Sequence, residues 1–177
     1  MLKLSNSYRP FCYTAALLLL AVFTKQVTAG EDDSSFGYKT LSGLKSVSVR
    51  VEGMRRNFKN HGLDGTEIQA FTEEKLTLSG LQIVDIDIAR IEPGAAFLRV
   101  NVTTNENQYG FYYYGVSVEL KRKISLNNPA GGFITGTIWK KGSTGVVMPT
   151  ELVKIRVAID GLLTQFLADY RSKNPSR

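Results

Sequence analysis

Hydrophobic residues recur along this chain with two different periods, and the order of these periods limits the possible folds more than any other feature. Along five stretches they alternate with polar residues, which is typical of half-buried β-strands. Along two others they return every three or four residues, which is typical of amphipathic helices. The predicted order of elements is therefore β-α-β-β-β-β-α.

Turn signals separate these elements and indicate how they pair. The predicted strands cover residues 44–52, 81–89, 96–103, 109–126 and 133–140; the predicted helices cover residues 66–79 and a stretch from the expected N-cap Thr150 to just before Asn174. A short turn at 105–107 predicts a hairpin, and glycine-rich turns are expected at 127–132 and 142–145. Two amphipathic helices need an apolar sheet face to cover. We therefore predict an α+β two-layer sandwich, with a mostly antiparallel sheet of about five strands and two helices on one face.

The N-terminus has the pattern of a cleavable export signal. Basic residues precede an apolar run at 11–23, which is shorter than the roughly 20 apolar residues that span a bilayer. Val27 and Ala29 are small residues at the −3 and −1 positions of a cut before Gly30. The pattern predicts a signal peptide over residues 1–29 and a protein that works in the periplasm or outside the cell.

Removal of residues 1–29 changes the chemistry available to the chain. Lys3, Arg9 and Lys25 leave and no acidic residue does, so the formal net charge falls from +6 to +3. Cys12, the sole cysteine, leaves as well, which excludes disulfides, thiol nucleophiles and thiolate metal sites. Cys12 also lacks the small-residue context of a lipid-attachment site. We expect a soluble protein, not a lipoprotein, with no transmembrane segment in the mature chain.

The remainder reads as one domain behind a leader. Residues 30–42 are small and polar without a period, which predicts a flexible leader. Residues 43–177 carry all the periodic segments, and a chain of this length buries a sizeable core. We predict a single α+β domain over residues 43–177.

Polar side chains offer few candidates for catalysis or metal binding. His61 is the only histidine, and it lies in a glycine-flanked loop without HxxxH spacing. Asp85 and Asp87 are two apart on a predicted strand face, where they could act as an acid/base pair or bind a hard cation, although the solvated side of an alternating strand explains them as well. No catalytic residue, metal ligand or cofactor is assigned.

Aromatic residues are the most unusual feature of the mature chain. In residues 108–115, QYGFYYYG, alternation directs Tyr112 and Tyr114 to the core and the other aromatic residues to the opposite face. The predicted binding residues on that face are Tyr109, Phe111, Tyr113, Phe133, Trp139 and Arg99. An aromatic surface of this kind indicates an interaction site. Ordinary cross-strand packing is the alternative, and a bulge at Gly115 would invert the face.

Several segments together resemble a group of exported bacterial proteins of similar length whose function is uncharacterised. These segments are VSVRVEGM, HGL, LSGLQI, LRVNV, TIWKKGSTG and the final KIRVAIDGLLTQFLADYRSKNP. The resemblance covers most of the mature chain, but its motifs are structural and it implies no catalytic residues. At the level of the fold, the element order is similar to small α+β domains of bacterial envelope assemblies.

These observations favour an exported, non-enzymatic binding or assembly module of the bacterial cell envelope that uses the aromatic face. Its expected partner is another envelope protein or a glycan, and we do not expect nucleic acid. The alternatives are a hydrolase or cation-dependent enzyme that uses Asp85 and Asp87, with or without His61, and a carbohydrate-binding domain.

Overall fold

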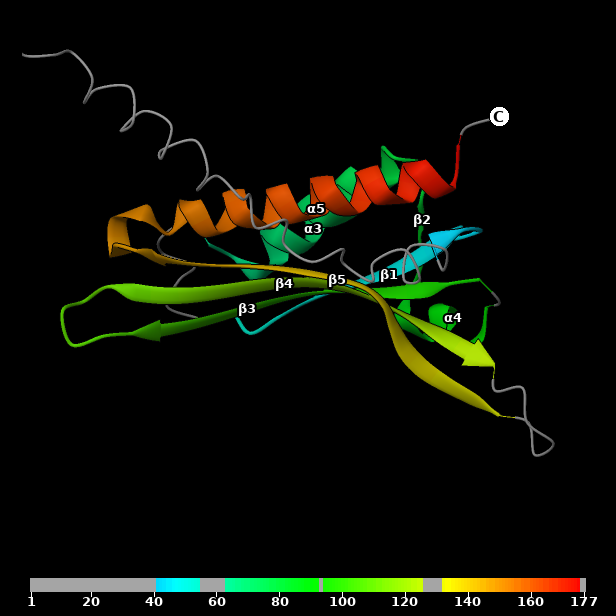
Figure 1. The fold of residues 1–177 in the computed structure, drawn as a ribbon, viewed down its shortest axis with the longest axis horizontal. Coiled ribbons are helices and arrows are strands. Elements are labelled where there is room, and N and C mark those ends of the chain that lie inside the picture. The colour runs from blue at the N-terminus through cyan, green and yellow to red at the C-terminus, as the bar shows by residue number, and fades with distance from the viewer. Residues whose placement is uncertain (1–40, 55–62, 93, 126–131, 176–177) are drawn as a thin grey trace, which may run out of the picture. The chain divides into compact units, whose positions relative to one another are not determined.

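The fold was taken from a computed structural model, which describes residues 41–54, 63–92, 94–125 and 132–175. The predicted signal peptide, most of the predicted leader and His61 lie outside these residues. The elements are β1 (Ser46–Glu52), α3 (Gly65–Thr77), β2 (Gln82–Ile83), α4 (Ile86–Ile91), β3 (Ala96–Glu106), β4 (Tyr112–Ser125), β5 (Phe133–Val147), a 3-10 turn (Pro149–Glu151) and α5 (Val153–Lys173). Figure 1 shows α3 and α5 together on one side of the sheet.

The five strands form one mixed sheet in the order β2-β1-β3-β4-β5. β1 pairs in parallel with both β2 and β3, whereas β3, β4 and β5 pair antiparallel. The two parallel pairs exist because α3 and α4 carry the chain across the sheet between their strands, and a parallel pair needs such a crossover. The predicted α+β class and five-stranded sheet are confirmed, and the hairpin between the third and fourth strands is present.

The core lies between the sheet and the two long helices. The alternating residues of β1, β3 and β4 point into it, as the sequence pattern predicts: Val47, Val49, Leu98, Val100, Val102, Tyr112, Val116, Val118 and Leu120 are all buried. α5 contributes the buried stripe Ile155, Ile159, Leu162, Leu163, Phe166, Leu167 and Tyr170. Leu41 is fully buried in the same core, so the packed region begins at least two residues before the expected boundary at 43.

The helix α3 matches its predicted range to within two residues. Asp64 is the N-cap, and its carboxylate accepts a 2.9 Å hydrogen bond from the Thr66 backbone N–H. At the other end Gly80 has φ +86°, and the Leu81 N–H donates to the Leu76 carbonyl. Leu81 is buried, so the helix ends in a glycine stop followed by an apolar residue that packs into the core.

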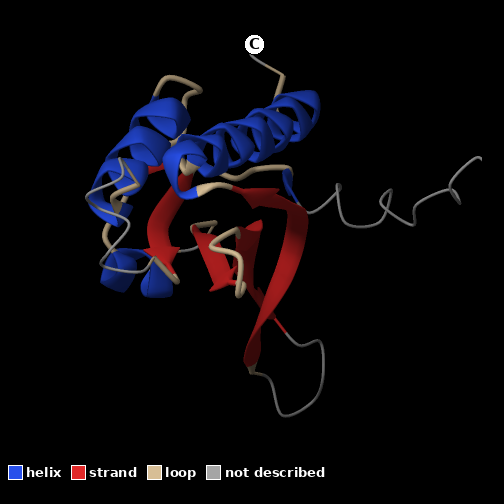
Figure 2. Ribbon diagram, turned by 90° about the vertical axis from the view of Figure 1, so that its left-hand side faces the viewer, coloured by secondary structure: helices blue, strands red, loops and turns tan. Residues whose placement is uncertain are grey.

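The predicted strand over residues 81–89 is wrong beyond its first residues. After the short β2, Asp85 caps the helix α4, because its carboxylate accepts a 2.9 Å hydrogen bond from the Asp87 N–H. α4 lies on the opposite side of the sheet from α3 and α5 (Figures 1 and 2) and buries Ala89. It covers the start of β1, where Ser46 and Ser48 are buried. The fold therefore has the two predicted helices on one face and a third on the other.

Two predictions at the C-terminal end are also wrong. β5 continues through residues 142–145, which were expected to form a turn, because β4 is long enough to pair with it up to Val147. Gly145 leaves room for the ring of Tyr114, whose atoms lie 2.7 Å from the position of a Cβ. Thr150 does not cap the last helix: it lies inside the 3-10 turn, and α5 begins after Leu152 without a side-chain cap.

A bulge divides the β4–β5 hairpin. Leu120 pairs with Trp139 and Lys121 pairs with Thr137, so Ile138 is the extra residue on β5. Beyond the bulge, residues 121–125 and 133–137 form a two-stranded extension of the sheet, here called the outer ribbon. Figure 1 shows this ribbon twisting away from the helices. The bulge changes which residues of β5 face the core.

Candidate functional site

The candidate site lies on the sheet face opposite α3 and α5, here called the open face. Opposite the buried residues of β3 and β4, the pairing brings Asn105, Tyr113 and Val146 into one cross-strand row, followed by Thr103, Gly115 and Thr144. Farther along lie Arg99, Glu119 and Lys140. The open face therefore changes along its length from apolar, through small and polar, to charged.

The apolar part is a cluster of large side chains at the β3–β4 turn. This aromatic end comprises Tyr109, Phe111, Tyr113, Val146 and Met148, all of which are exposed. Tyr109 is 75% exposed and Tyr113 is 53% exposed. Tyr113 and Val146 are direct cross-strand partners, and such partners have side chains in contact range. A contiguous exposed group of this kind marks an interaction surface more often than scattered single residues do.

The turn that carries the first two aromatic residues is held by one asparagine. The side-chain oxygen of Asn107 accepts 2.9 Å hydrogen bonds from the N–H groups of both Tyr109 and Phe111. The Asn107 N–H donates to the Phe111 carbonyl at 2.9 Å, and the Gly110 N–H donates to the Asn107 carbonyl at 3.1 Å. Gly110 has φ +79°, a conformation that glycine adopts without strain. The loop is therefore fixed by its own hydrogen bonds before any partner binds.

A shallow depression adjoins the aromatic end. This polar trough has a volume of about 300 Å³ and is lined by Asn101, Thr103, Gly115, Ser117, Gly142, Ser143 and Thr144, with Val116 in its floor. Gly115 provides its depth, because a Cβ there would lie 2.9 Å from the Thr103 hydroxyl. Hydroxyl and amide groups thus line a hollow two residues along β4 from Tyr113.

The charged part of the open face is internally paired. The Glu119 carboxylate lies 2.7 Å from the Lys140 ammonium and 3.6 Å from the Lys121 ammonium. The hydrogen bond from Lys140 holds the pKa of the Glu119 carboxyl below its usual 4.5. On the neighbouring strands, Glu52 pairs with both Arg99 and Arg50. Arg99, a predicted binding residue, is on the expected face, but its guanidinium is paired with a carboxylate.

The six predicted binding residues do not form one platform. Tyr109, Phe111 and Tyr113 lie together at the aromatic end. Phe133 lies on the same face but pairs with Ser125, twelve residues along β4 from Tyr113. Twelve residues of strand span about 40 Å. The structure therefore divides the predicted platform between the two ends of the sheet.

Trp139 is on the wrong face for the prediction. It is 4% exposed, and its ring packs edge-on against Phe166 of α5 with 5.2 Å between the ring centroids. The extra residue Ile138 is the cause, because strict alternation from Phe133 would have placed Trp139 on the open face. The predicted binding role of Trp139 is replaced by a role in the core.

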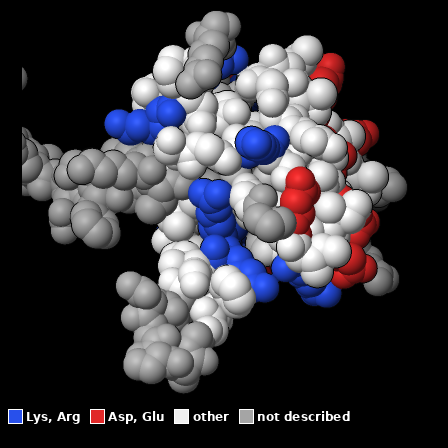
Figure 3. All heavy atoms as spheres, turned by 90° about the vertical axis from the view of Figure 1, so that its right-hand side faces the viewer, with Lys and Arg blue, Asp and Glu red and all other residues white. Residues whose placement is uncertain are grey.

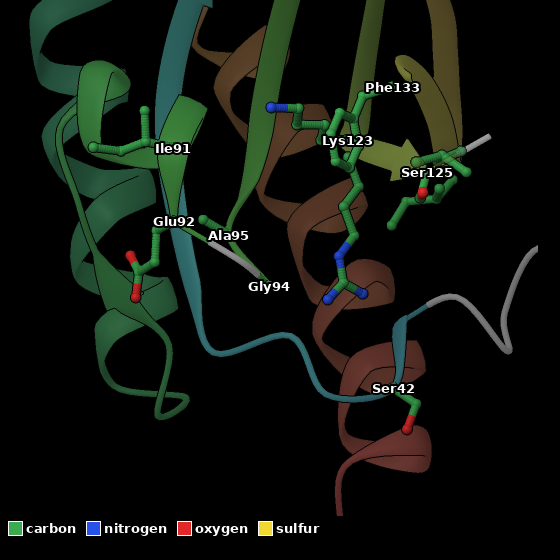
Figure 4. A pocket seen from close by; sticks show the side chains of 11 residues that line it. Ser42, Ile91, Glu92, Gly94, Ala95, Lys123, Ser125 and Phe133 are labelled. Atoms are coloured by element: carbon green, nitrogen blue, oxygen red, sulfur yellow. The ribbon is translucent and has the colours of Figure 1, made fainter. Parts of the chain in front are cut away.

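A second candidate surface, which sequence reasoning missed, is a pocket of about 550 Å³ between α4 and the outer ribbon. Figure 4 shows Ile91 and Glu92 on one wall, Lys123 and Phe133 on the facing wall, and Ser42 at its lower end. Arg122, Ile124 and Ile138 also line this end pocket. It depends on α4 and on the bulge, and neither was predicted. Ile91, which lies two residues beyond the predicted strand over 81–89, is 80% exposed beside the pocket.

The paired aspartates are occupied by local interactions. Asp85 caps α4, and the Asp87 carboxylate accepts a 3.0 Å hydrogen bond from Arg90. Their predicted position on one strand face is wrong, because residues 86–91 are helical. Among the described residues no group of three or more His, Cys, Asp or Glu side chains is placed to hold a metal ion. No helix in the described part of the chain is long and apolar enough to cross a membrane.

Comparisons with known proteins find solved structures whose folds are similar to that of this chain. No protein-family model and no curated protein matches this sequence. A minor lipoprotein from Acinetobacter baumannii is 15% identical with a TM-score of 0.39, over 74% of this chain and 93% of that one. A PelC dodecamer from Paraburkholderia phytofirmans is 18% identical with a TM-score of 0.37, over 76% of this chain and 90% of that one. At these values the likenesses transfer neither function nor assembly.

Proposed function

We propose that this chain is an exported binding or assembly module of the bacterial cell envelope, and that it contacts a partner protein through the aromatic end. The observation that carries the proposal is the exposure of five large side chains at one end of the open face: Tyr109, Phe111, Tyr113, Val146 and Met148. The export pattern of residues 1–29 supports the envelope as the place of action.

The energetics favour a binding role for this cluster. Burial of a large apolar side chain contributes about 1.5–3 kcal/mol relative to its exposure. Tyrosine adds a hydroxyl that tolerates both water and a partner, which is why tyrosine is frequent at interaction sites. The cluster therefore has the composition of an energetically dominant interface patch.

Preorganisation strengthens the same case. The four hydrogen bonds of the Asn107 turn fix the backbone that presents Tyr109 and Phe111. Tyr113 and Val146 are fixed by the β4–β5 ladder. A surface ordered before binding loses less conformational entropy when the partner arrives.

A glycan is the second candidate partner, and the polar trough favours it. Sugar rings stack on aromatic side chains while their hydroxyls hydrogen-bond to neighbouring polar groups. Tyr113 supplies a ring beside the hydroxyls of Thr103, Ser117 and Thr144. A nucleic acid would instead depend on cations, and the cations in the middle of the open face are paired with Glu52 and Glu119.

Co-purification tests the proposal. The exported chain and its double variant Phe111→Ala/Tyr113→Ala would be recovered from native envelope extracts. Because a central aromatic contributes about 2 kcal/mol or more, we expect roughly a tenfold or greater loss of the partner in the variant. The matched control is Leu78→Ala/Val157→Ala, which removes two exposed apolar side chains from α5 and the end of α3. Equal recovery in all three chains would refute the aromatic end as the binding surface.

Titration with soluble fragments of cell-wall glycan separates the two candidate partners. A glycan partner would shift the backbone signals of Thr103 and Ser117 with little dependence on salt. A protein partner would leave these signals unchanged in the glycan titration. A steep loss of affinity with salt would indicate a polyanion instead.

A further inference from the structure

β5 is an edge strand of the sheet. Among the described strands its neighbour is β4 alone, so the side of β5 away from β4 carries backbone groups that the sheet does not pair. The Asn107 N–H donates to the Phe111 carbonyl at the β3–β4 turn, and alternation along the ladders from this bond fixes which residues face outward. The residues of β5 that direct their N–H and C=O groups outward are Lys140, Gly142, Thr144 and Val146.

The C-terminal part of this edge lacks the features that keep edge strands from pairing. Charged side chains, proline and bulges serve that purpose in native sheets. The bulge of β5 and the adjacent Lys140 and Lys141 come earlier in the strand. Both lysines have carboxylate partners in their own chain, Glu119 and Asp169 respectively. Residues 142–147 (GSTGVV) contain no charge and no proline, so this part of the edge is suited to pairing with another strand.

A groove runs between this edge and α5. It has a volume of about 400 Å³, and its lining includes Gly142 and Ser143 of β5 and Ala158 and Gly161 of α5. Gly161 lies in the middle of α5, where glycine weakens a helix relative to alanine. No atom from another part of the described chain lies within 4 Å of the position that a Cβ would take there. The described part of a single copy therefore gives no reason for this glycine, whereas a close neighbour in the groove would.

The geometry of β5 suits a second copy of the same strand. A two-fold interface requires one surface patch that is complementary to itself. The regular part of β5, between the bulge and the end of the strand, is residues 139–147, and its midpoint is Ser143. An antiparallel partner centred there uses the whole regular segment. The same axis passes the level of Gly161, because Ser143 and Gly161 line one groove.

This arrangement is also compatible with the charges of the chain. Lys140 lies opposite Val146 of the second copy, so no two lysines are directly opposed. Each outer ribbon, which carries residues 121–123 (KRK), ends at Thr137, six residues from Ser143, so the two ribbons are about 40 Å apart. Figure 3 shows the molecule from the end of the outer ribbon, with Lys and Arg side chains in a band down the middle. Antiparallel pairing thus separates these like charges.

We propose that two copies of this chain pair antiparallel along their β5 edges, with a two-fold axis through Ser143, and form one continuous sheet. Each hydrogen-bonded pair of facing residues exchanges two backbone hydrogen bonds. The α5 helices lie side by side over the axis, where Gly161 allows close approach. The aromatic end stays on the open face, so this inference goes beyond the proposed function and does not depend on it.

Sedimentation equilibrium of the exported chain tests the assembly. We expect a reversible equilibrium between monomer and dimer, with two chains as the upper limit of mass. A single monomer at concentrations up to about 1 mM, the weak end of specific association, would overturn the proposal. Masses above two chains would also overturn it, because head-to-tail contacts continue beyond a pair.

Disulfide crosslinking tests the position of the axis. In a Cys12→Ser background, Ser143→Cys would be the sole thiol. Directly opposite residues of a non-hydrogen-bonded pair have Cα atoms about 4.5 Å apart, which a disulfide can bridge. We expect a crosslinked dimer after treatment with oxidised glutathione, and none for the matched control Thr137→Cys on the same strand. No crosslink at position 143, or equal crosslinking at both positions, would contradict this axis.

Substitution at Gly161 tests the contact between the helices. Gly161→Gln places a helix-favouring side chain in space that is open in one copy. We therefore expect the monomer to fold and the dissociation constant of the dimer to rise roughly tenfold or more. The matched control Val153→Gln changes an exposed residue of the same helix and should leave the dissociation constant unchanged. Unchanged dimerisation in Gly161→Gln, or equal weakening in both variants, would refute close approach at Gly161.

Discussion

The indole Nε1 of Trp139 on β5 donates a 2.9 Å hydrogen bond to the carboxylate of Asp169 on α5. Asp169 also lies 3.3 Å from the Lys141 ammonium, so one carboxylate links two residues of β5 to the last helix. The ring of Trp139 packs on Phe166 in the same place. This cluster fixes the C-terminal part of α5 to the part of β5 that lies beside the bulge.

Replacement of Trp139 should therefore destabilise the fold. Trp139→Phe retains an aromatic ring but removes the donor to Asp169. Because hydrogen bonds to charged groups contribute about 1.5–3 kcal/mol, we expect a loss of free energy of unfolding in that range. Urea denaturation would measure it. A cycle with Asp169→Ala should show coupling, and strictly additive effects would contradict a direct interaction.

Gly53 should tolerate no side chain, for a reason that the strand order creates. It has φ +80°, and a Cβ there would lie 2.1 Å from the Val102 carbonyl oxygen. Gly43 has φ +71° but open space around it. We expect Gly43→Ala to cost about 1–2 kcal/mol, the penalty of the left-handed conformation alone, and Gly53→Ala to cost clearly more. Equal melting temperatures for the two variants would argue against the close approach of Gly53 to β3.

The Glu119–Lys140 pair predicts a pH dependence of stability. Lys140 lowers the pKa of folded Glu119 below its unfolded value of 4.5. The pair therefore stabilises the fold above pH 4.5, and its contribution is lost as the pH falls through the lowered pKa. Lys140→Gln should cost up to about 1 kcal/mol at pH 7, since Lys140 is exposed, and less at pH 3. A cost that stays constant between these pH values would exclude an ionic origin.

The N-terminal pattern predicts the mass of the exported protein. Cleavage after Ala29 leaves Gly30 as the first residue and removes Cys12. Intact-mass analysis of the protein from its native compartment should give a cysteine-free chain that begins at Gly30. A lysine substituted for Ala29 should block cleavage, because the −1 position accepts only small residues. Recovery of the full-length chain from wild-type cells would contradict the signal peptide.

Sequence periodicity predicted those parts of the fold in which packing follows local pattern. Val47 and Val49, or Leu98 and Val100, alternate because one sheet face is buried under helices. Ile86 and Ile88 show the same alternation, yet the carboxylate of Asp85 caps a helix there. Alternation over four or five residues does not distinguish a strand from one short helix that buries a single side chain.

The candidate site was predictable only on one side of the bulge. Tyr109 and Phe111 in the β3–β4 turn and Tyr113 on β4 are distant from the bulge, and simple alternation placed them on the correct face. Trp139 follows the extra residue Ile138, so counting from Phe133 inverted its position. The separation of Phe133 from Tyr113 depends on the register of two long strands, which arises from pairing distant in sequence.

Site-specific photo-crosslinking in living cells tests the binding role of the aromatic end most directly. Tyr113 would be replaced by p-benzoylphenylalanine, and Val157 on the exposed side of α5 would be replaced in a matched control. We predict one discrete crosslinked partner from position 113 and none from position 157. No adduct at 113, or the same adducts from both positions, would contradict the account.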